Sequence, residues 1–168
     1  MPERSRPSEA DDIRFLRRTF DLARGARSRG NHPFGALLVD GSGAVLIETE
    51  NGFLPDRDRT AHAELLLATQ ACRAYDARTL ALSTIYSSAE PSAMCAGAIY
   101  WAGIGRVVFA LSERRLKALT GDHADNPTLD LPCRIVFAAG QRPTEVKGPL
   151  IEDEAAALHS GTWDRGAP

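Results

Sequence analysis

The sequence predicts an α/β layer fold with a mixed sheet, and three observations support that prediction. Two apolar segments enclose a Gly-rich turn, which is the pattern of a β-hairpin. Further apolar segments then alternate with segments of helical periodicity, as in proteins that cover a sheet with helices. A chain of 168 residues, 43% of them hydrophobic, is long enough to bury one core. We therefore expect a single domain over residues 1–168, with the polar residues 1–10 flexible.

The first half of the chain predicts a helix, a hairpin and a second helix. Ser8, with Asp11 three residues later, forms an N-cap pattern. Apolar residues then recur at helical spacing, and Gly30 and Asn31 end the first helix. The elements expected after it are strands over 34–39 and 44–48 around a turn at 40–43, and a helix over 61–74.

The second half of the chain alternates strands with helices and contains one irregular excursion. Pro91 begins a helix that extends to about Ala102, since proline is well tolerated in a first helical turn. Residues 120–132 are rich in Gly, Asp, Asn and Pro, which predicts a loop. The other elements expected are strands over 84–87, over 106–110 and around Val146, a short helix or strand over 133–138, and helices over 112–119 and 151–159.

Charge and composition argue against several classes of protein. The formal net charge of -2 is unlike that of a nucleic-acid-binding surface. No apolar run is long enough to span a membrane, and the N-terminus lacks the apolar segment of a signal peptide. Three cysteines at unrelated spacings do not make a disulfide framework, so we expect a cytoplasmic protein in which Cys133 is a small buried residue.

Two short motifs carry the chemistry of this chain. His62-Ala63-Glu64 begins one predicted helix, and the segment from Pro91 to Cys95 begins another. The zinc deaminase signature is H-x-E followed by P-C-x-x-C, in which one His and two Cys bind zinc and the Glu transfers protons. In this chain Ser92 stands where the signature has its first cysteine. Either motif alone is a weak signal, but their order on two helix starts is a strong one.

The spacing within the motifs suits a catalytic metal site. Positions 92 and 95 lie three residues apart on a helix and face the same side. The N-termini of the two helices favour anions such as a thiolate. Three protein ligands leave a position for a water molecule, whose pKa zinc lowers to about 7. Glu64 is placed to serve as the general acid and base.

These residues and their surroundings resemble the cytidine deaminase-like superfamily, in particular its nucleobase and nucleoside deaminases. The segments that carry the resemblance are Pro33–Ala36, Asn51, Thr60–Glu64, Tyr86–Pro91 and Met94–Ala102. The resemblance implies a three-layer α-β-α fold with a mixed five-stranded sheet, and a homodimer. It also implies Zn²⁺ as cofactor and a nucleobase or related N-heterocyclic amine as substrate.

The resemblance assigns roles to individual positions. His62 and Cys95 resemble zinc ligands, with Ser92 at a weak or absent ligand position, and Glu64 resembles the proton shuttle. Trp163 lies where related enzymes cover the pocket with a C-terminal segment. The substrate-binding positions are the amide of Asn51, the backbone N–H of Ala63, and the aromatic walls Phe34 and Trp101, for which ordinary core packing is the alternative.

Ser92 leaves the level of activity open, because a hydroxyl is a neutral, hard ligand whereas a thiolate is a soft one. The site could bind zinc weakly, the serine could be an engineered change, or the chain could be a metal-poor binding homologue. A zinc-dependent aminohydrolase acting on a free base is our leading hypothesis, and Glu64 favours it over a binding-only protein. A tRNA adenosine deaminase is the nearest enzyme alternative. It needs a basic face, whereas the C-terminal half is rich in acidic residues: Asp122, Asp125, Asp130, Glu152, Asp153 and Glu154.

Overall fold

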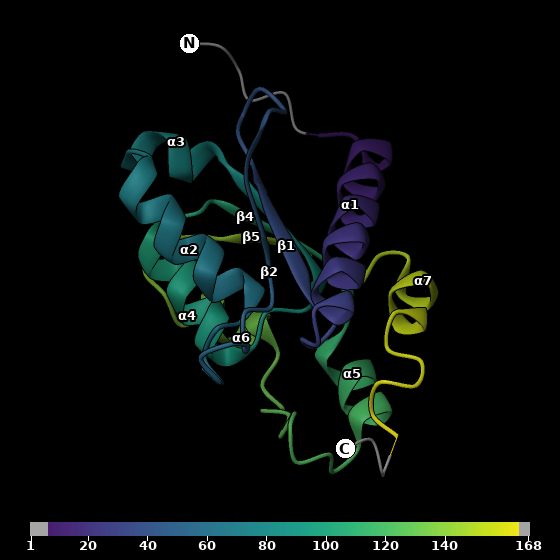
Figure 1. Ribbon diagram of the computed structural model, residues 1–168. Helices are drawn as coiled ribbons and strands as arrows, with labels where there is room; N and C mark the ends of the chain where they lie inside the picture. The colour runs from purple at the N-terminus through teal and green to yellow at the C-terminus, as the bar shows by residue number, and fades with distance from the viewer. Residues whose placement is uncertain (1–6, 165–168) are drawn as a thin grey trace.

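A computed structural model describes residues 7–164 and places a five-stranded sheet between two layers of helices (Figure 1). The strands are β1 (Gly35–Val39), β2 (Val45–Glu50), β3 (Thr84–Ala89), β4 (Arg106–Leu111) and β5 (Glu145–Lys147). They are ordered β2-β1-β3-β4-β5. Strand β1 is antiparallel to β2 and β3, whereas β3, β4 and β5 run parallel. The predicted mixed five-stranded sheet is therefore confirmed.

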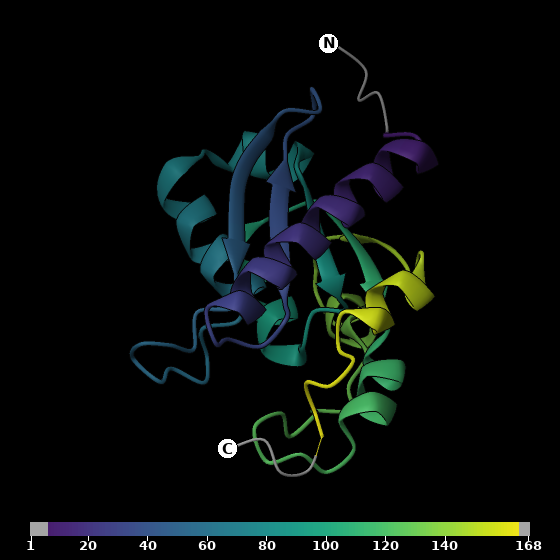
Figure 2. The ribbon, with the colours of Figure 1, turned by 45° about the vertical axis from the view of Figure 1, so that its right-hand side comes forward.

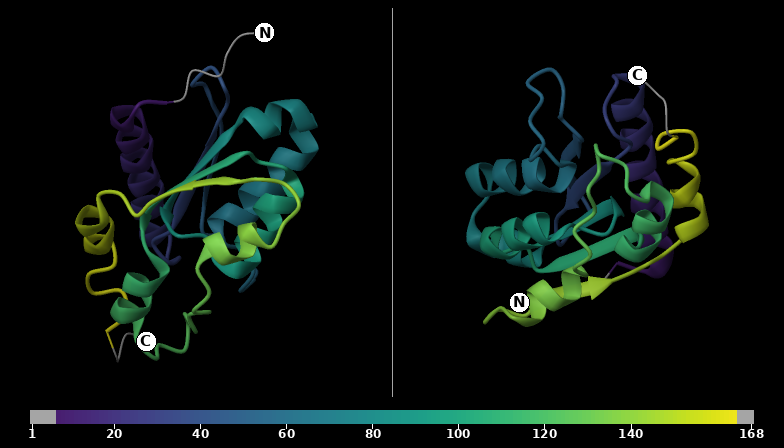
Figure 3. Two further views of the ribbon diagram at one scale, coloured as in Figure 1. Left: turned by 180° about the vertical axis from the view of Figure 1, so that it is seen from behind. Right: turned by 90° about the horizontal axis from the view of Figure 1, so that it is seen from below.

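The helices divide between the two faces of the sheet (Figures 1 and 3). On one face lie α1 (Glu9–Ser28) and α7 (Glu152–Ala157), with α5 (Glu113–Thr120) beside α7. On the other face lie α2 (Ala63–Ala74), α3 (Ala77–Leu82), α4 (Ala93–Ala102) and α6 (Cys133–Ala138). The arrangement is the three-layer α-β-α fold that the sequence predicted. Among the described helices, none is long and apolar enough to cross a membrane.

Strand β1 shows how the sheet builds both halves of the core. Its side chains alternate between the two faces, as the period of two in a strand requires. Ala36 and Leu38 pack with α2 and α4, whereas Leu37 and Val39 pack with α1. All four side chains are fully buried. Because both faces are covered, this central strand is a continuous apolar run rather than an alternating one.

The start of α1 confirms the predicted N-cap and corrects one boundary. The Ser8 hydroxyl accepts a hydrogen bond from the Asp11 backbone N–H at 3.1 Å, and the Asp11 carboxylate accepts one from the Ser8 N–H at 3.2 Å. This capping box fixes the first turn, so Glu9 and Ala10 are helical rather than part of a flexible segment. Within the rest of that predicted segment, residues 1–6 lie outside the described residues.

A buried charge cluster fastens α1 to the sheet. The Asp12 carboxylate accepts two hydrogen bonds from Arg106 at 2.9 Å, one from Lys147 at 2.9 Å and one from the Tyr86 hydroxyl at 2.7 Å. Burial raises the pKa of Asp12, but these hydrogen bonds outweigh burial and hold the pKa below its usual value. These bonds connect helix α1 to strands β3, β4 and β5, on the face of the sheet opposite α2 and α4.

Candidate active site

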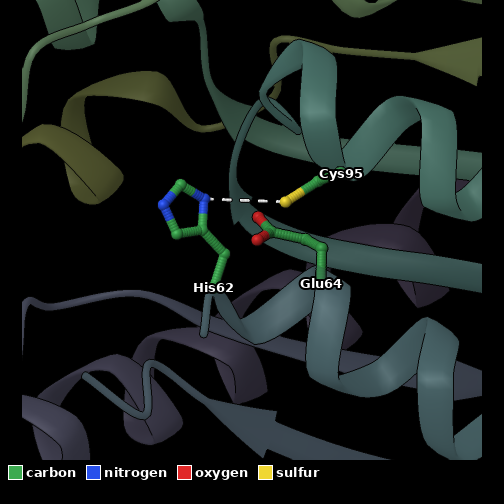
Figure 4. A group of neighbouring side chains, drawn as sticks. All are labelled: His62, Glu64 and Cys95. Carbon is green, nitrogen blue, oxygen red and sulfur yellow. Dashed lines mark hydrogen bonds between the residues drawn. The ribbon is translucent and has the colours of Figure 1, made fainter. Parts of the chain in front are cut away.

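His62, Glu64 and Cys95 come together where α2 and α4 begin (Figure 4). The His62 Nδ1 atom lies 3.6 Å from the Cys95 Sγ atom. One ligand atom from each of the three side chains lies within 4.8 Å of the others. The sequence placed these residues at two helix starts, and the structure brings those starts side by side.

Local hydrogen bonds hold each of these side chains in place. His62 is the N-cap residue of α2, and Glu64 lies in the first turn of that helix. The Thr49 hydroxyl of β2 donates to the Ala63 carbonyl at 2.8 Å, which fixes this turn against the sheet. The Ser87 hydroxyl of β3 donates to Glu64 Oε1. Glu64 therefore keeps one orientation although it lies in an almost fully buried position.

The Cys95 thiol is fully buried, and its surroundings bear on metal binding. Burial, together with the charge of Glu64, raises its pKa far above the usual value. A cation is what makes a buried thiolate beside a carboxylate favourable, since metal binding removes the thiol proton. Imidazole nitrogen, thiolate sulfur and carboxylate oxygen are all donors that zinc accepts. The residues present therefore fit a zinc ion.

Ser92 occupies the N-cap of α4 rather than a free ligand position. Its hydroxyl accepts a hydrogen bond from the Cys95 backbone N–H at 3.3 Å. Serine is among the best N-cap residues, so the side chain has a structural use that does not require a metal. Ser92 also lines the cavity in front of His62 and Glu64, so its hydroxyl lies next to the metal group.

A cavity of about 250 Å³ opens onto His62 and Glu64. Its walls come from the ends of β3 and β4, from the starts of α4 and α5, and from the loop that follows α5. In open α/β sheets ligands bind beyond the carboxyl ends of parallel strands, and this cavity lies there. The lining residues are Phe34, Arg59, His62, Glu64, Ala89, Glu90, Ser92, Met94, Glu113, Leu116, Asp125, Asn126, Pro127, Thr128 and Leu129.

The structure separates the predicted substrate positions. Phe34 lines the cavity as expected. Ala63 is the first residue of α2, so its N–H has no partner within the helix. Asn51 is buried beside the cavity wall but is not one of its lining residues, and its backbone N–H donates to the Phe34 carbonyl at 3.0 Å. The Asn51 side-chain oxygen accepts from the Phe53 N–H at 3.1 Å, as in a turn.

Trp101 does not line the cavity, and core packing does not explain it either. Its side chain is 82% exposed on the outer surface of α4. The expectation of a pocket wall at this position is therefore not met within the chain. Helix α4 consists almost entirely of apolar residues, so its sequence gives no stripe from which the buried face can be predicted.

Several lining residues were not predicted from the sequence. Arg59, Glu90, Glu113 and Asp125 all line the cavity. Glu90 directly follows strand β3, and only Ser112 separates Glu113 from the end of strand β4. The polar groups of a ligand site gather at the carboxyl ends of parallel strands. That signal was available in the sequence. Asp125 lies in an irregular loop, and no pattern in the sequence indicates its place.

The C-terminal segment packs behind Phe34, beside the loop that follows α5 (Figure 2). The Trp163 ring is stacked on His159, with 6.0 Å between ring centroids, and its Nε1 atom donates to His159 Nδ1 at 3.1 Å. It also meets His123 of that loop edge-on at 5.5 Å. Trp163 does not itself line the cavity, so the segment supports the cavity wall from outside.

His159 predicts a loss of stability in acid. Burial lowers its pKa to about 4, with Arg27 and His32 contributing. The unfolded chain takes up this proton near pH 6.5 and the folded chain only near pH 4, so the free energy of unfolding falls as the pH drops between these values. The full loss amounts to about 3 kcal/mol. We expect His159→Phe to be less stable than the parent at pH 7.5, where it lacks the bond to Trp163, but to lose less stability on acidification.

Urea unfolding of both proteins at pH 7.5 and pH 4.5 measures this difference. The acidic groups are common to both proteins, so the difference between the two pH effects isolates His159. An equal loss in parent and variant would contradict the assignment.

Comparisons with known proteins identify relatives of this chain. Residues 9–111 match the family model for the cytidine and deoxycytidylate deaminase zinc-binding region. A probable cytosine deaminase of Schizosaccharomyces pombe is 41% identical over 92% of this chain and 94% of its own length. The guanine deaminase of Bacillus subtilis is 40% identical over 57% of this chain and 62% of its own length.

Solved structures agree with these relatives. A guanine deaminase from Nitrosomonas europaea superposes with a TM-score of 0.71 at 27% identity, covering 86% of this chain and 80% of its own. A protein designated NE0047, crystallised with 2,6-diaminopurine, superposes with a TM-score of 0.74 at 26% identity, covering 96% of this chain and 86% of its own.

The tRNA-specific adenosine deaminase of Haemophilus influenzae is 34% identical over 71% of this chain and 73% of its own length.

The fold and the His62–Glu64–Cys95 group define a hydrolytic deaminase. The chain belongs to the cytidine and deoxycytidylate deaminase family, whose matching region is zinc-binding.

Proposed function

We propose that this protein is a zinc-dependent aminohydrolase that removes the exocyclic amine of a free nucleobase or related N-heterocycle and releases ammonia. The observation that carries the proposal is the position of the His62–Glu64–Cys95 group at the wall of the 250 Å³ cavity. Ligand pockets are commonly about 300–1,000 Å³ in volume. A cavity of about 250 Å³, slightly below this range, favours a single base over a nucleotide.

The chain's own residues account for the proton transfers. His62 and Cys95 would hold the zinc, with the Ser92 hydroxyl beside them. Zinc, when bound, polarises the attacking water. The Glu64 carboxylate accepts the two protons of that water one after the other, and it delivers the first to the ring nitrogen and the second to the departing amine, which leaves as ammonia. The Ser87 hydroxyl keeps Glu64 turned toward this position throughout.

The charge of the cavity supports a free base rather than tRNA. Four acidic side chains line it, and Arg59 is the single lysine or arginine among the lining residues. Phosphate groups bind to basic surfaces, and the loop over the cavity carries Asp122, Asp125 and Asp130. The tRNA-specific relatives are less similar than the probable cytosine deaminase, which agrees with this preference.

Zinc analysis and ammonia release test the proposal together. Protein purified without chelator is analysed for zinc and assayed with cytosine, guanine, isocytosine, adenine, 2,6-diaminopurine and an adenosine-containing tRNA. We expect bound zinc and ammonia from at least one free base. Deamination of the tRNA alone would favour the alternative enzyme. Absence of both zinc and turnover would favour a metal-poor binding protein.

Asn51→Ala is expected to lower kcat/KM for every accepted base without releasing zinc. The Asn51 amide can pair with a ring carbonyl and a neighbouring N–H, and each group left unpaired costs about 1–3 kcal/mol, roughly 5- to 150-fold. Steady-state kinetics with each base measure the loss. Asn51→Asp separates the two roles of the side chain, because it keeps an oxygen that can accept from Phe53 but replaces the amide donor by a negatively charged acceptor. It should therefore also lose kcat/KM if the amide pairs with the base. Unchanged kinetics in Asn51→Ala would make this residue a turn former only.

Three further expectations belong to the proposal. The exposed Trp101 ring supports a homodimer, since a second subunit would cover it. A single domain over residues 1–168 and a cytoplasmic location stay predictions from the sequence. Sedimentation of the parent protein and of Trp101→Ser tests the first, with a weakened dimer expected in the variant.

A further inference from the structure

Two glutamates at the carboxyl ends of neighbouring parallel strands differ sharply in their surroundings. Glu90 lies just beyond β3, and both of its carboxylate oxygens are occupied. One accepts from the Glu113 backbone N–H at 2.9 Å and the other from the Cys133 backbone N–H at 2.9 Å. Glu90 therefore joins the starts of α5 and α6, and its role in the fold is clear.

Glu113, just beyond β4, has no such role. Its side chain lines the cavity and the residue is only 4% exposed. Among residues 7–164, no group donates a hydrogen bond to its carboxylate, and no cation pairs with it. Burial and the charges of Glu90 and Glu64 raise its pKa to about 7. A buried carboxylate without a partner destabilises the folded state.

An unpaired acceptor inside a ligand cavity is suited to a donor on the ligand. The proposed reaction already uses Glu64 and the metal group to engage the amine that leaves. Glu113 lies in a different element, at the start of α5, and is not part of the metal group. A carboxylate at this place can bind an amino group or a ring N–H, and hydrogen bonds to charged groups are the stronger ones.

We propose that Glu113 is a specificity-determining residue that accepts hydrogen bonds from a second amino group of the substrate, remote from the amine that is removed. The enzyme accordingly prefers diamino heterocycles to those carrying one amine. This inference rests on the proposed function, and it adds the substrate class that the same cavity selects.

Three purines that differ by single amino groups test the inference: 2,6-diaminopurine, adenine and 2-aminopurine. Their kcat/KM values are measured for the parent, for Glu113→Gln and for Glu154→Gln. Glu154 is an exposed glutamate on α7 that pairs with Arg17, so its variant controls for loss of one negative charge. We expect the parent to prefer 2,6-diaminopurine. In Glu113→Gln, which keeps an acceptor oxygen but loses the charge, the kcat/KM for 2,6-diaminopurine should fall about 5- to 10-fold, mainly through KM. The single-amine purine that carries only the departing amine should change less than about threefold.

Two other results would overturn the inference. An equal loss for 2,6-diaminopurine and for the single-amine purine that is deaminated, or a loss confined to kcat, would mean that Glu113 acts in the chemistry or in the fold. Thermal unfolding tests whether Glu113 has a role in the fold. Glu113→Gln should unfold at the same temperature as the parent or higher, because it removes an unpaired buried charge. A lower unfolding temperature would point to a structural role.

The role of Glu113 can be tested even if the protein has no deaminase activity. If the parent protein releases no ammonia from any base, calorimetric Kd values for the three purines replace the kinetic constants. Preference for 2,6-diaminopurine that disappears in Glu113→Gln would still support the assignment. Equal Kd values for the three purines, or no binding of any of them, would refute it.

Discussion

Replacing Glu64 by glutamine is expected to reduce deamination by about 10²–10⁴-fold, the contribution that a positioned general acid and base commonly makes. Glutamine keeps the length of the side chain, and its carbonyl oxygen can still accept the hydrogen bond from the Ser87 hydroxyl. It cannot take up a proton from water or return one to the ring. The loss should therefore appear in kcat, measured by ammonia release at saturating base.

The fold and the metal content should survive this change. Glu64 lies in the first turn of α2, where glutamine is an equally good helix former. Glu48→Gln is a suitable control, because Glu48 lies on the exposed side of β2 and pairs with Arg18. Its turnover should match the parent. A Glu64→Gln variant that keeps most of its turnover, with zinc bound, would remove Glu64 from the mechanism.

Local patterns were sufficient to predict most of the sheet and its helices. The capping box at Ser8 and the turn at 40–43 are decided by residues close in sequence, and both are present in the structure. Helix α3 was not predicted. It is only six residues long, too short for a periodic pattern, and it forms because Asp76 caps it and Leu80 enters the core. Tertiary packing decides such an element.

In the candidate site too, some residues could be predicted from local sequence patterns and others depend on tertiary packing. His62, Glu64 and Cys95 were predictable because each lies in a helical first turn or cap, and two helix starts at one edge of a sheet must lie close together. Glu113 was not predicted, since its significance depends on which groups surround it in space. The exposure of Trp101 could not be predicted, because an all-apolar helix does not reveal its exposed face.

The substitution of Ser92 by cysteine is expected to tighten zinc binding by about 10²–10³-fold. Structural zinc sites with four ligands bind with apparent free energies of about 10–16 kcal/mol, or about 2.5–4 kcal/mol for each ligand. The Ser92 hydroxyl already lies beside the metal group and shares the first turn of α4 with Cys95. A thiolate there would supply a second soft, negatively charged ligand, which zinc prefers to a hydroxyl.

Competition with a chelator at fixed pH measures this change in zinc Kd. The variant should also lose some helix stability, since cysteine is a poorer N-cap than the serine that accepts from the Cys95 N–H. Ser8→Cys is the matched control, because Ser8 caps α1 in the same way and belongs to no metal group. It should leave the zinc Kd unchanged. If Ser92→Cys binds zinc no better than the parent, then Glu64 or water already completes the site, and the missing cysteine does not limit metal binding in this protein.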